Sequence, residues 1–316
     1  MIKYICKKIF MSVLVVGTVA FDAIETPFGK TEKIVGGAAT YICLSSLFFT
    51  KKINLVSVVG DDFPLKDIKM LQEKGVDTKG LQIKQGEKTF FWSGKYHNNM
   101  NTRDTIETQL NVLENFDPIV PEEFKNSEYL MLGNLMPLVQ KRVLDQMNKK
   151  PKLIVLDTMN FWMDHFMKDL KNALKEVDVL TINDEEARQL SGEYSLIKAA
   201  KTILNMGPKY VIIKKGEHGA LLFKSDDVFF VPSLPLEEVL DPTGAGDSFA
   251  GGFIGYLATT GDIGFENMKR ALLYATVLAS FSVEKFGTEN LKTITKKHID
   301  FRIKQIKKLT NIDLKE

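Results

Sequence analysis

Apolar and polar positions along the chain follow two alternating patterns. Short runs of β-branched and other apolar residues are typical of strands buried on both faces, because such strands show no apolar–polar alternation. Other segments repeat apolar residues every three or four positions, as amphipathic helices do. This succession predicts a mainly parallel sheet covered by helices. Strands are expected at 12–16, 54–59, 129–132, 153–156, 179–182 and 209–213, and helices at 42–49, 67–74, 139–147, 170–177 and 271–282.

A different pattern follows the second of these strands. Residues 81–96 are rich in aromatic and β-branched side chains, which favours strands over helices. We expect a small second sheet with strands from about 23–34 and 81–105. The polar run 97–116 is typical of a solvated loop. Asn101 and Arg103 within it are substrate candidates because they neighbour this second sheet.

Both ends of the chain carry lysine-rich segments. Lysines precede an apolar run at 9–21, which is the outline of a secretory signal. We favour a buried first strand at 13–17 instead, with residues 1–10 as an N-terminal extension or Met11 as the true start. At the other end, residues 292–308 place isoleucines among lysines. That pattern predicts an amphipathic surface helix and not a membrane anchor.

The composition is that of an ordinary globular protein. The chain has 316 residues, 44% apolar and 26% charged, with a net charge of +2. We therefore expect one α/β domain from 11 to 316, with neither nucleic acid nor membrane as a partner. Cys6 and Cys43 form no disulfide or metal pattern. A reducing, cytoplasmic location is expected.

The most informative stretch is a glycine-rich loop that runs into an apolar segment at 253–257, which predicts a tight loop opening a buried helix. Gly244 and Gly246 leave the backbone amides of the loop unobstructed. Amides at a helix start have no partner within the helix, so together with the helix dipole they form an anion site. Asp247 either caps this helix or accepts a proton from a hydroxyl, and its position alone leaves both interpretations open.

The wording of this loop resembles the C-terminal signature of the ribokinase-like (PfkB) family of carbohydrate and nucleoside kinases. The resemblance implies that Asp247 is the catalytic base and that the amides of Gly244, Ala245 and Gly246 form the hole for charge on the transferred phosphoryl group. Further motifs in family order extend the resemblance from about 11 to 288. It implies a ribokinase-like three-layer α/β fold, with a central, mostly parallel sheet and a small β lid that closes on substrate.

The acceptor side carries a second group of matching residues. The turn after the first strand lacks the G-x-G-x-x-G of a dinucleotide fold, which argues against an NAD enzyme. The resemblance implies that Asp22 binds sugar hydroxyls and that Gly36 and Gly37 let the substrate lie against the backbone. The sequence departs from the family pattern at Tyr41, where many members have asparagine, so the acceptor stays open. Asn134 is a further substrate candidate, because it follows a predicted strand at its carboxyl end.

Two motifs point to the nucleotide. Asn183 caps the next helix in the ordinary interpretation, with the acids after it favouring the helix dipole. The spacing from Asn183 to Glu186 also resembles the Asn-x-x-Glu element of the family, which organises magnesium and phosphates. Glu186 would then hold magnesium through water. A later glycine turn resembles the nucleotide-side turn of the family, which makes Lys215, Gly216 and Gly219 nucleotide candidates.

We therefore expect an ATP-dependent phosphotransferase that moves the γ-phosphate to a hydroxyl of a sugar, with Mg²⁺ and a monovalent cation such as K⁺ near the anion loop. No P-loop motif occurs in the chain. The aromatic second sheet and Tyr41 also suit stacking on a base, so an adenosine-like nucleoside kinase is the alternative. A ligand-binding or regulatory protein without turnover is less favoured, because Asp247 and the loop are complete. Some relatives pair through the lid, so a homodimer through it is also expected.

Overall fold

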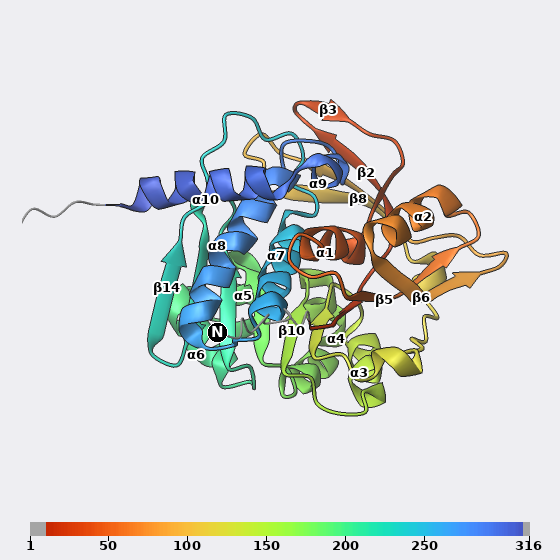
Figure 1. The fold of residues 1–316 in the computed structure, drawn as a ribbon, viewed down its shortest axis with the longest axis horizontal. Coiled ribbons are helices and arrows are strands. Elements are labelled where there is room, and N and C mark those ends of the chain that lie inside the picture. The colour runs from red at the N-terminus through yellow and green to blue at the C-terminus, as the bar shows by residue number, and fades with distance from the viewer. Residues whose placement is uncertain (1–10, 312–316) are drawn as a thin grey trace, which may run out of the picture.

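The computed structural model describes residues 11–311, so the N-terminal extension expected at 1–10 lies outside the described residues. The central element is a nine-stranded sheet (Figure 1). All neighbouring strands from β12 to β6 pair in parallel, and β13 and β14 add an antiparallel edge. The predicted mainly parallel sheet is therefore confirmed. In spatial order the strands are β14 (Asp227–Val231), β13 (Ala220–Lys224), β12 (Tyr210–Lys214), β11 (Val179–Asn183), β10 (Leu153–Asp157), β9 (Tyr129–Leu132), β1 (Val13–Val16), β5 (Ile53–Gly60) and β6 (Val76–Lys84).

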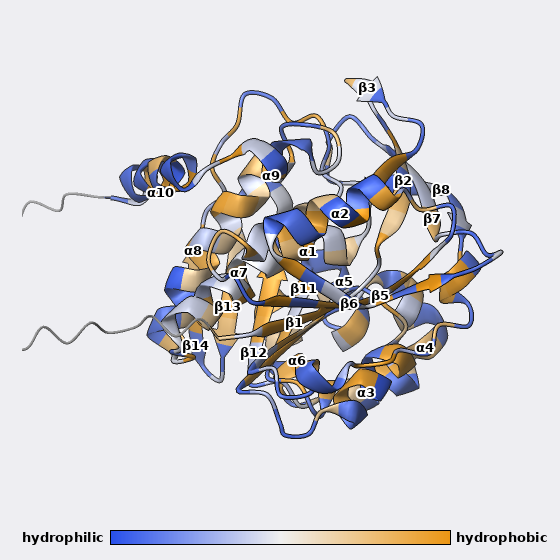
Figure 2. Ribbon diagram, turned by 45° about the vertical axis from the view of Figure 1, so that its right-hand side comes forward, coloured by the Kyte–Doolittle hydropathy of each residue, from blue (hydrophilic) through white to orange (hydrophobic). Residues whose placement is uncertain are grey.

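The strands are apolar on both faces because helices cover both faces. In β1, Val13 and Val15 pack into one core, while Leu14 and Val16 pack into the other. Figure 2 shows the sheet close to edge-on between the two helix layers. The first core lies under α1 (Ala38–Ser46), α2 (Leu65–Lys74), α7 (Ala245–Thr260), α8 (Phe265–Ser282), α9 (Glu289–Thr293) and α10 (Lys296–Thr310), and the second under α3 (Pro137–Gln146), α4 (Asn160–Leu174), α5 (Asp184–Ser191) and α6 (Leu196–Leu204).

A five-stranded sheet stands beside the large one. Its strands are β3 (Gly29–Lys30), β2 (Ala20–Thr26), β7 (Phe91–Tyr96) and β8 (Arg103–Gln109) in spatial order, with β4 (Ile34–Gly36) also paired to β2. Because β2 follows β1 directly, this small sheet starts at the carboxyl ends of the parallel strands. It corresponds to the lid that we expected, and we refer to it as the lid sheet.

Two sequence-based expectations for this region are wrong in detail. Residues 81–84 belong to β6, which pairs with β5 in the large sheet and not with the lid sheet. A half-exposed edge strand carries the same mixed pattern as a lid strand, so sequence could not separate them. The polar run 97–116, interpreted as a solvated loop, contains β8 at 103–109, which pairs with β7; only the first three residues of β8 fall within the lid strands expected as far as about 105. Every residue of β8 is exposed, so no buried face leaves an apolar pattern.

The lysine-rich tail forms α10. Its buried residues Ile299, Ile303 and Ile306 join the core under α8, while lysines fill the outer face. The predicted amphipathic surface helix is confirmed. None of the described helices is both long and apolar enough to cross a lipid bilayer.

Candidate functional site

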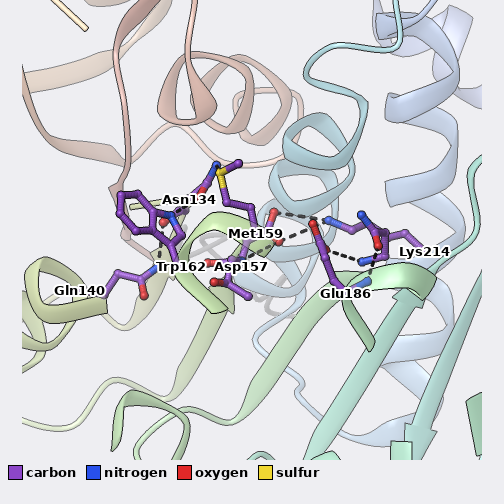
Figure 3. A network of polar contacts seen from close by, with 10 residues as sticks. Asn134, Gln140, Asp157, Met159, Trp162, Glu186 and Lys214 are labelled. Atoms are coloured by element: carbon purple, nitrogen blue, oxygen red, sulfur yellow. Dashed lines mark hydrogen bonds and ion pairs between the residues drawn. The ribbon is translucent and has the colours of Figure 1, made fainter. Parts of the chain in front are cut away.

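Three neighbouring strands bring polar side chains to one edge of the large sheet. β10, β11 and β12 run parallel, and their last residues are Asp157, Asn183 and Lys214. Ligands of parallel sheets gather at this edge. The Lys214 ammonium lies 3.4 Å from both carboxylate oxygens of Asp157, and Glu186 stands next to this pair (Figure 3).

Asn183 and Glu186 cap α5 reciprocally. The Asn183 backbone amide donates to the Glu186 carboxylate at 2.8 Å, and the Glu186 backbone amide donates to the Asn183 side-chain oxygen at 2.8 Å. This capping box is the structural role that the sequence allowed for both residues. Burial raises the pKa of Glu186 to about 7, although the charge of Lys214 opposes that shift. The protonation of this carboxyl group therefore changes near neutral pH.

Lys214 is a buried cation among carboxylates. Burial disfavours its charge, but Asp157, Glu186 and Asp247 outweigh that effect and raise the pKa of this lysine. The ammonium also lies against the glycine-rich loop before α7 (residues 241–247), which we call the anion loop. It is 3.0 Å from the place where a Cβ on Gly246 would stand. Lys214 therefore holds a fixed positive charge beside the loop.

The glycine-rich loop opens α7, as predicted. Gly244 is the N-cap residue and has a left-handed backbone, with φ at 76°. The Ala245 amide donates to the Pro242 carbonyl at 3.1 Å and so closes a turn. Of the three amides expected in the anion hole, that of Ala245 is therefore already engaged, which corrects this part of the prediction. Within the described part of the chain, the amides of Gly244, Gly246 and Asp247 have no hydrogen-bond acceptor. These amides, at the positive end of the helix dipole, form a site suited to an anion.

Asp247 lies half-buried in the first turn of α7. Burial and the charge of Asp157 raise the pKa of Asp247 to about 7, while Lys214 and Arg103 oppose the shift. A carboxyl group with a pKa near neutral is suited to accept a proton from a hydroxyl. No side chain of the described residues donates a hydrogen bond to it.

Asp22 and two glycines form a further part of the site. The Gly37 amide donates to the Asp22 carboxylate at 3.3 Å. A Cβ on Gly36 would stand 1.9 Å from the same carboxylate oxygen, so only glycine leaves room for this aspartate. Burial raises the pKa of Asp22 to about 7, with Asp241 and Asp247 adding to the shift and the Gly37 amide opposing it.

Asp241 and Tyr41 support the anion loop from inside the protein. The fully buried Asp241 carboxylate accepts the amides of Thr243 and Gly287, each at 2.8 Å. It thereby ties the loop to the connection between α8 and α9. The ring of Tyr41 in α1 lies against the loop, because a Cβ on Gly244 would stand 2.4 Å from it.

Asn134, just beyond β9, belongs to an aromatic corner of the site. Trp162 of α4 donates its indole N–H to the Asn134 side-chain oxygen at 2.7 Å, and the Asn134 amide donates to the Met159 sulfur at 3.1 Å (Figure 3). Phe161 packs edge-on against Trp162 with ring centroids 4.9 Å apart, and it is 41% exposed. An aromatic surface therefore borders a predicted substrate residue.

The lid sheet and the segment before β8 contact two parts of the site, the anion loop and the turn after β12. Thr243 of the anion loop donates to the Tyr96 hydroxyl of β7 at 3.2 Å. Asn101, which precedes β8, donates to Glu217 in the turn after β12 at 3.2 Å. The charge of Arg103 at the start of β8 opposes the raised pKa of Asp247. The lid sheet thus connects the anion loop with the predicted nucleotide turn.

Most of the predicted residues meet at this edge of the large sheet. The Gln140 side chain donates to the Asp157 carbonyl at 3.0 Å and to the Gly133 carbonyl at 2.9 Å. It thereby links the end of β10 to the residues that follow β9. Lys215 closes the turn after β12, since its amide donates to the Gly219 carbonyl at 2.8 Å. Gly216 also lies in that turn.

Sequence reasoning did not select Asp157 or Lys214 as site residues. Both end an apolar strand, and a charged residue at that position was the available signal. The glycine-turn pattern directed attention to Lys215 instead. For Lys215 the structure shows no ion pair within residues 11–311.

The site fits magnesium only as a companion of phosphate. Within residues 11–311, no group of three or more His, Cys, Asp or Glu side chains could hold a metal ion by itself. Mg²⁺ takes phosphate oxygens and keeps several waters, so one or two carboxylates suffice. Asp157 and Glu186 lie near Lys214, and the Lys214 ammonium borders the anion loop at Gly246. These two carboxylates are therefore the candidates beside the phosphates.

Comparison with known proteins gives a consistent result. The sequence profile of the pfkB family of carbohydrate kinases matches residues 11–295. The chain is 30% identical over 250 residues to a cytidine kinase of Thermococcus kodakarensis, covering 77% of this chain and 87% of that protein. It is 27% identical to a nucleoside kinase of Methanothermobacter thermautotrophicus, covering 87% and 90%.

Solved structures agree on the fold. A ribokinase II from E. coli, crystallised with ATP and Mg²⁺, superposes with a TM-score of 0.75 at 22% identity, covering 93% of this chain and 99% of that one. The ribokinase-like fold expected from the sequence is thereby confirmed. Kinases of this kind use ATP with Mg²⁺.

Proposed function

Since this chain belongs to the pfkB family of carbohydrate kinases, we propose that it transfers the γ-phosphate of ATP to a hydroxyl of a sugar or of the sugar unit of a nucleoside, with Asp247 as the base. That it is a carbohydrate or nucleoside kinase follows from the family and its relatives. The residue roles are supported by one arrangement above all. Asp247 stands beside amides without acceptors in the described chain and interacts electrostatically with the buried Lys214.

In the proposed reaction, Asp247 accepts the proton of the acceptor hydroxyl. The oxygen of that hydroxyl attacks the γ-phosphorus of ATP, and ADP leaves. The amides of Gly244, Gly246 and Asp247 donate to the phosphoryl oxygens as charge develops on them. The Lys214 ammonium adds a positive charge already fixed beside Gly246. Because these groups are in place before the reaction, little reorganisation is needed to stabilise the charge.

On the nucleotide side, Mg²⁺ bound with ATP would supply charge neutralisation of the phosphates. Asp157 and Glu186 would hold its water ligands, and Asn183 keeps Glu186 in position through the capping box. The turn with Lys215, Gly216 and Gly219 would border the nucleotide.

On the acceptor side, Asp22 accepts hydrogen bonds from sugar hydroxyls, and Gly36 and Gly37 allow the sugar to lie against the backbone. A nucleoside acceptor is favoured by a specific observation, the exposed ring of Phe161, which packs on the buried Trp162 beside Asn134. An exposed ring of this kind suits stacking on a base. The relatives named as cytidine and nucleoside kinases agree with this choice.

A monovalent cation such as K⁺ fits beside Asp241. This carboxylate is fully buried and has no cationic side-chain partner within the described residues. Among the described residues, the exposed strand β8 has no neighbour on its outer edge in the lid sheet, which suits pairing with a second copy in a homodimer. We further propose that residues 11–316 act as one kinase domain.

The test is ADP release from the purified protein with Mg-ATP and K⁺, across cytidine, adenosine, inosine, ribose, 2-deoxyribose and sugar phosphates. Wild type should release ADP with at least one acceptor, and Asp247→Asn should release far less. Release that is equal in both proteins would overturn the proposed base. Binding of ATP without ADP release in any mixture would favour the ligand-binding alternative.

A further inference from the structure

The C-terminal helix α10 holds an arginine against the end of α8, on which it packs (Figure 1). The side chain of Arg302 is only 12% exposed. Its guanidinium group donates to the Ser280 hydroxyl at 2.9 Å and pairs with the Glu284 carboxylate at 2.6 Å. The central carbon of this group lies 3.6 Å from the centroid of the Phe281 ring, so the group also stacks on that ring. Three contacts therefore fix the arginine on one short segment of the chain.

Glu284 belongs to the connection between α8 and α9, residues 283–288. Its second carboxylate oxygen accepts from the Asn290 side chain at 3.1 Å, and the same Asn290 amide donates to the Phe281 carbonyl at 2.7 Å. The carboxylate is thus held from two sides, by α10 and by α9. Without Arg302 this partly buried carboxylate would lose its cation, and the connection would lose its tie to α10.

The same connection supports the anion loop. The Val283 carbonyl accepts the backbone amide of Asp241 at 3.1 Å, and the Gly287 amide donates to the Asp241 carboxylate at 2.8 Å. Val283 and Gly287 flank Glu284 in the chain. The residue that Arg302 holds therefore lies between the two points at which the connection holds Asp241.

The lid sheet rests on this connection as well. A Cβ on Gly29 of β3 would stand 3.2 Å from the ring of Phe286. A Cβ on Gly287 would stand 2.8 Å from the side chain of Ile34 in β4. A shift of the connection would therefore reach both the anion loop and the lid sheet.

We propose that Arg302 is a positioning residue for phosphoryl transfer, because it fixes the α8–α9 connection and thereby Asp241 and the anion loop. This inference rests on the proposed function, in which amides of that loop stabilise the transferred group. The matched family profile ends at residue 295, so α10 lies outside the part of the chain that the profile covers. Arg302 acts through the backbone hydrogen bonds of the connection and not by contact with substrate.

The first test compares ADP release by Arg302→Met and wild type, well below the Tm of both proteins. The kcat should fall by about 10- to 100-fold, because a displacement of about 1 Å in groups that position reacting atoms has effects of that size. Lys209→Met is the matched control. Lys209 pairs with the buried Asp178 at 2.9 Å, and both precede their strands, at the opposite end of β11 and β12 from the site. Both variants should lower Tm, but only Arg302→Met should lower kcat.

The second test does not depend on activity. Hydrogen exchange, followed by mass spectrometry of peptides that cover residues 240–247, reports on the backbone amides that Val283 and Asp241 hold. These amides should exchange faster in Arg302→Met than in wild type, and at the wild-type rate in Lys209→Met. If Arg302→Met does not fold, Arg302→Lys takes its place in both tests, since it keeps the charge but loses the planar fork and the stacking.

Three results would overturn the proposal: unchanged exchange in residues 240–247 of the arginine variant, an unchanged kcat in that variant, or an equal fall of kcat in Lys209→Met. If wild type releases no ADP with any acceptor, the proposed function has failed. The exchange measurement then still decides whether α10 controls the anion loop.

Discussion

Gly244 is the position where one added methyl group should separate folding from catalysis. It starts α7 with φ at 76°, and a Cβ there would stand 2.4 Å from a ring carbon of Tyr41. We predict that Gly244→Ala folds but loses most of its turnover. Both the conformation of the residue and the contact with Tyr41 contribute to this expectation.

The size of the effect follows from these two terms. A left-handed backbone costs a non-glycine residue about 1–2 kcal/mol. Ordinary contact begins near 3.4 Å, so the loop or the ring must move by about 1 Å, and such overpacking costs about 1–3 kcal/mol more. A shift of about 1 Å in groups that position reacting atoms lowers kcat/KM by about 10²-fold.

Gly192→Ala is the matched control. Gly192 has φ at 74° and no atom within 4 Å of its added Cβ, so it carries the backbone term alone. For a chain of this length, each kcal/mol lowers Tm by about 1.5 °C. We expect a loss of about 1–3 °C with normal kcat/KM in Gly192→Ala, and a larger loss of both Tm and kcat/KM in Gly244→Ala.

The assays are thermal unfolding and ADP release with the best acceptor. If Gly244→Ala kept normal kcat/KM and matched the Tm of Gly192→Ala, the contact between Tyr41 and the anion loop would not exist as described. A Tm far below the expected range, with no folded protein, would instead show that the loop is essential for folding and would refute the separation of the two effects.

Three further predictions concern the charged groups of the site. Asp247→Asn should lower kcat by about 10²–10⁴-fold while Kd for ATP, measured by calorimetry, stays within a few-fold, and near-normal kcat would remove Asp247 from the mechanism. Because the pKa of Asp247 is raised to about 7 and the base must be ionised, kcat/KM should rise about tenfold from pH 6 to pH 8. Lys214→Met should move this rise to higher pH, since the charge of Lys214 opposes the raised pKa of Asp247. A pH profile that does not move in this variant would contradict that role of Lys214. Asp22, Glu186 and Asp247 have pKa values raised to about 7, above about 4 in unfolded chains. The folded state therefore binds protons more tightly, so the free energy of unfolding of the ligand-free protein should fall as pH rises from about 4 to 7; a Tm that rises over this range in thermal scans would contradict the assignment.

The sequence by itself determined the parts that depend on local patterns. Apolar runs located the parallel strands, since a strand buried on both faces leaves an unmistakable composition. The glycine-rich loop before α7 predicted an anion site, because glycine residues and a helix start can be recognised locally. Most of strand β8 was not predicted, because an exposed strand has no buried face and therefore no apolar pattern.

Only the tertiary structure decided which distant residues meet. The order of strands in the sheet, set by packing over the whole chain, puts Asp157 and Lys214 3.4 Å apart although they are far apart in sequence. The same folding lays Tyr41 of α1 against Gly244 of α7 and leaves its hydroxyl buried. Side-chain direction and burial arise from contacts between elements, so no local spacing could reveal that the cation of the site is Lys214 or that the ring of Tyr41 lies against the anion loop.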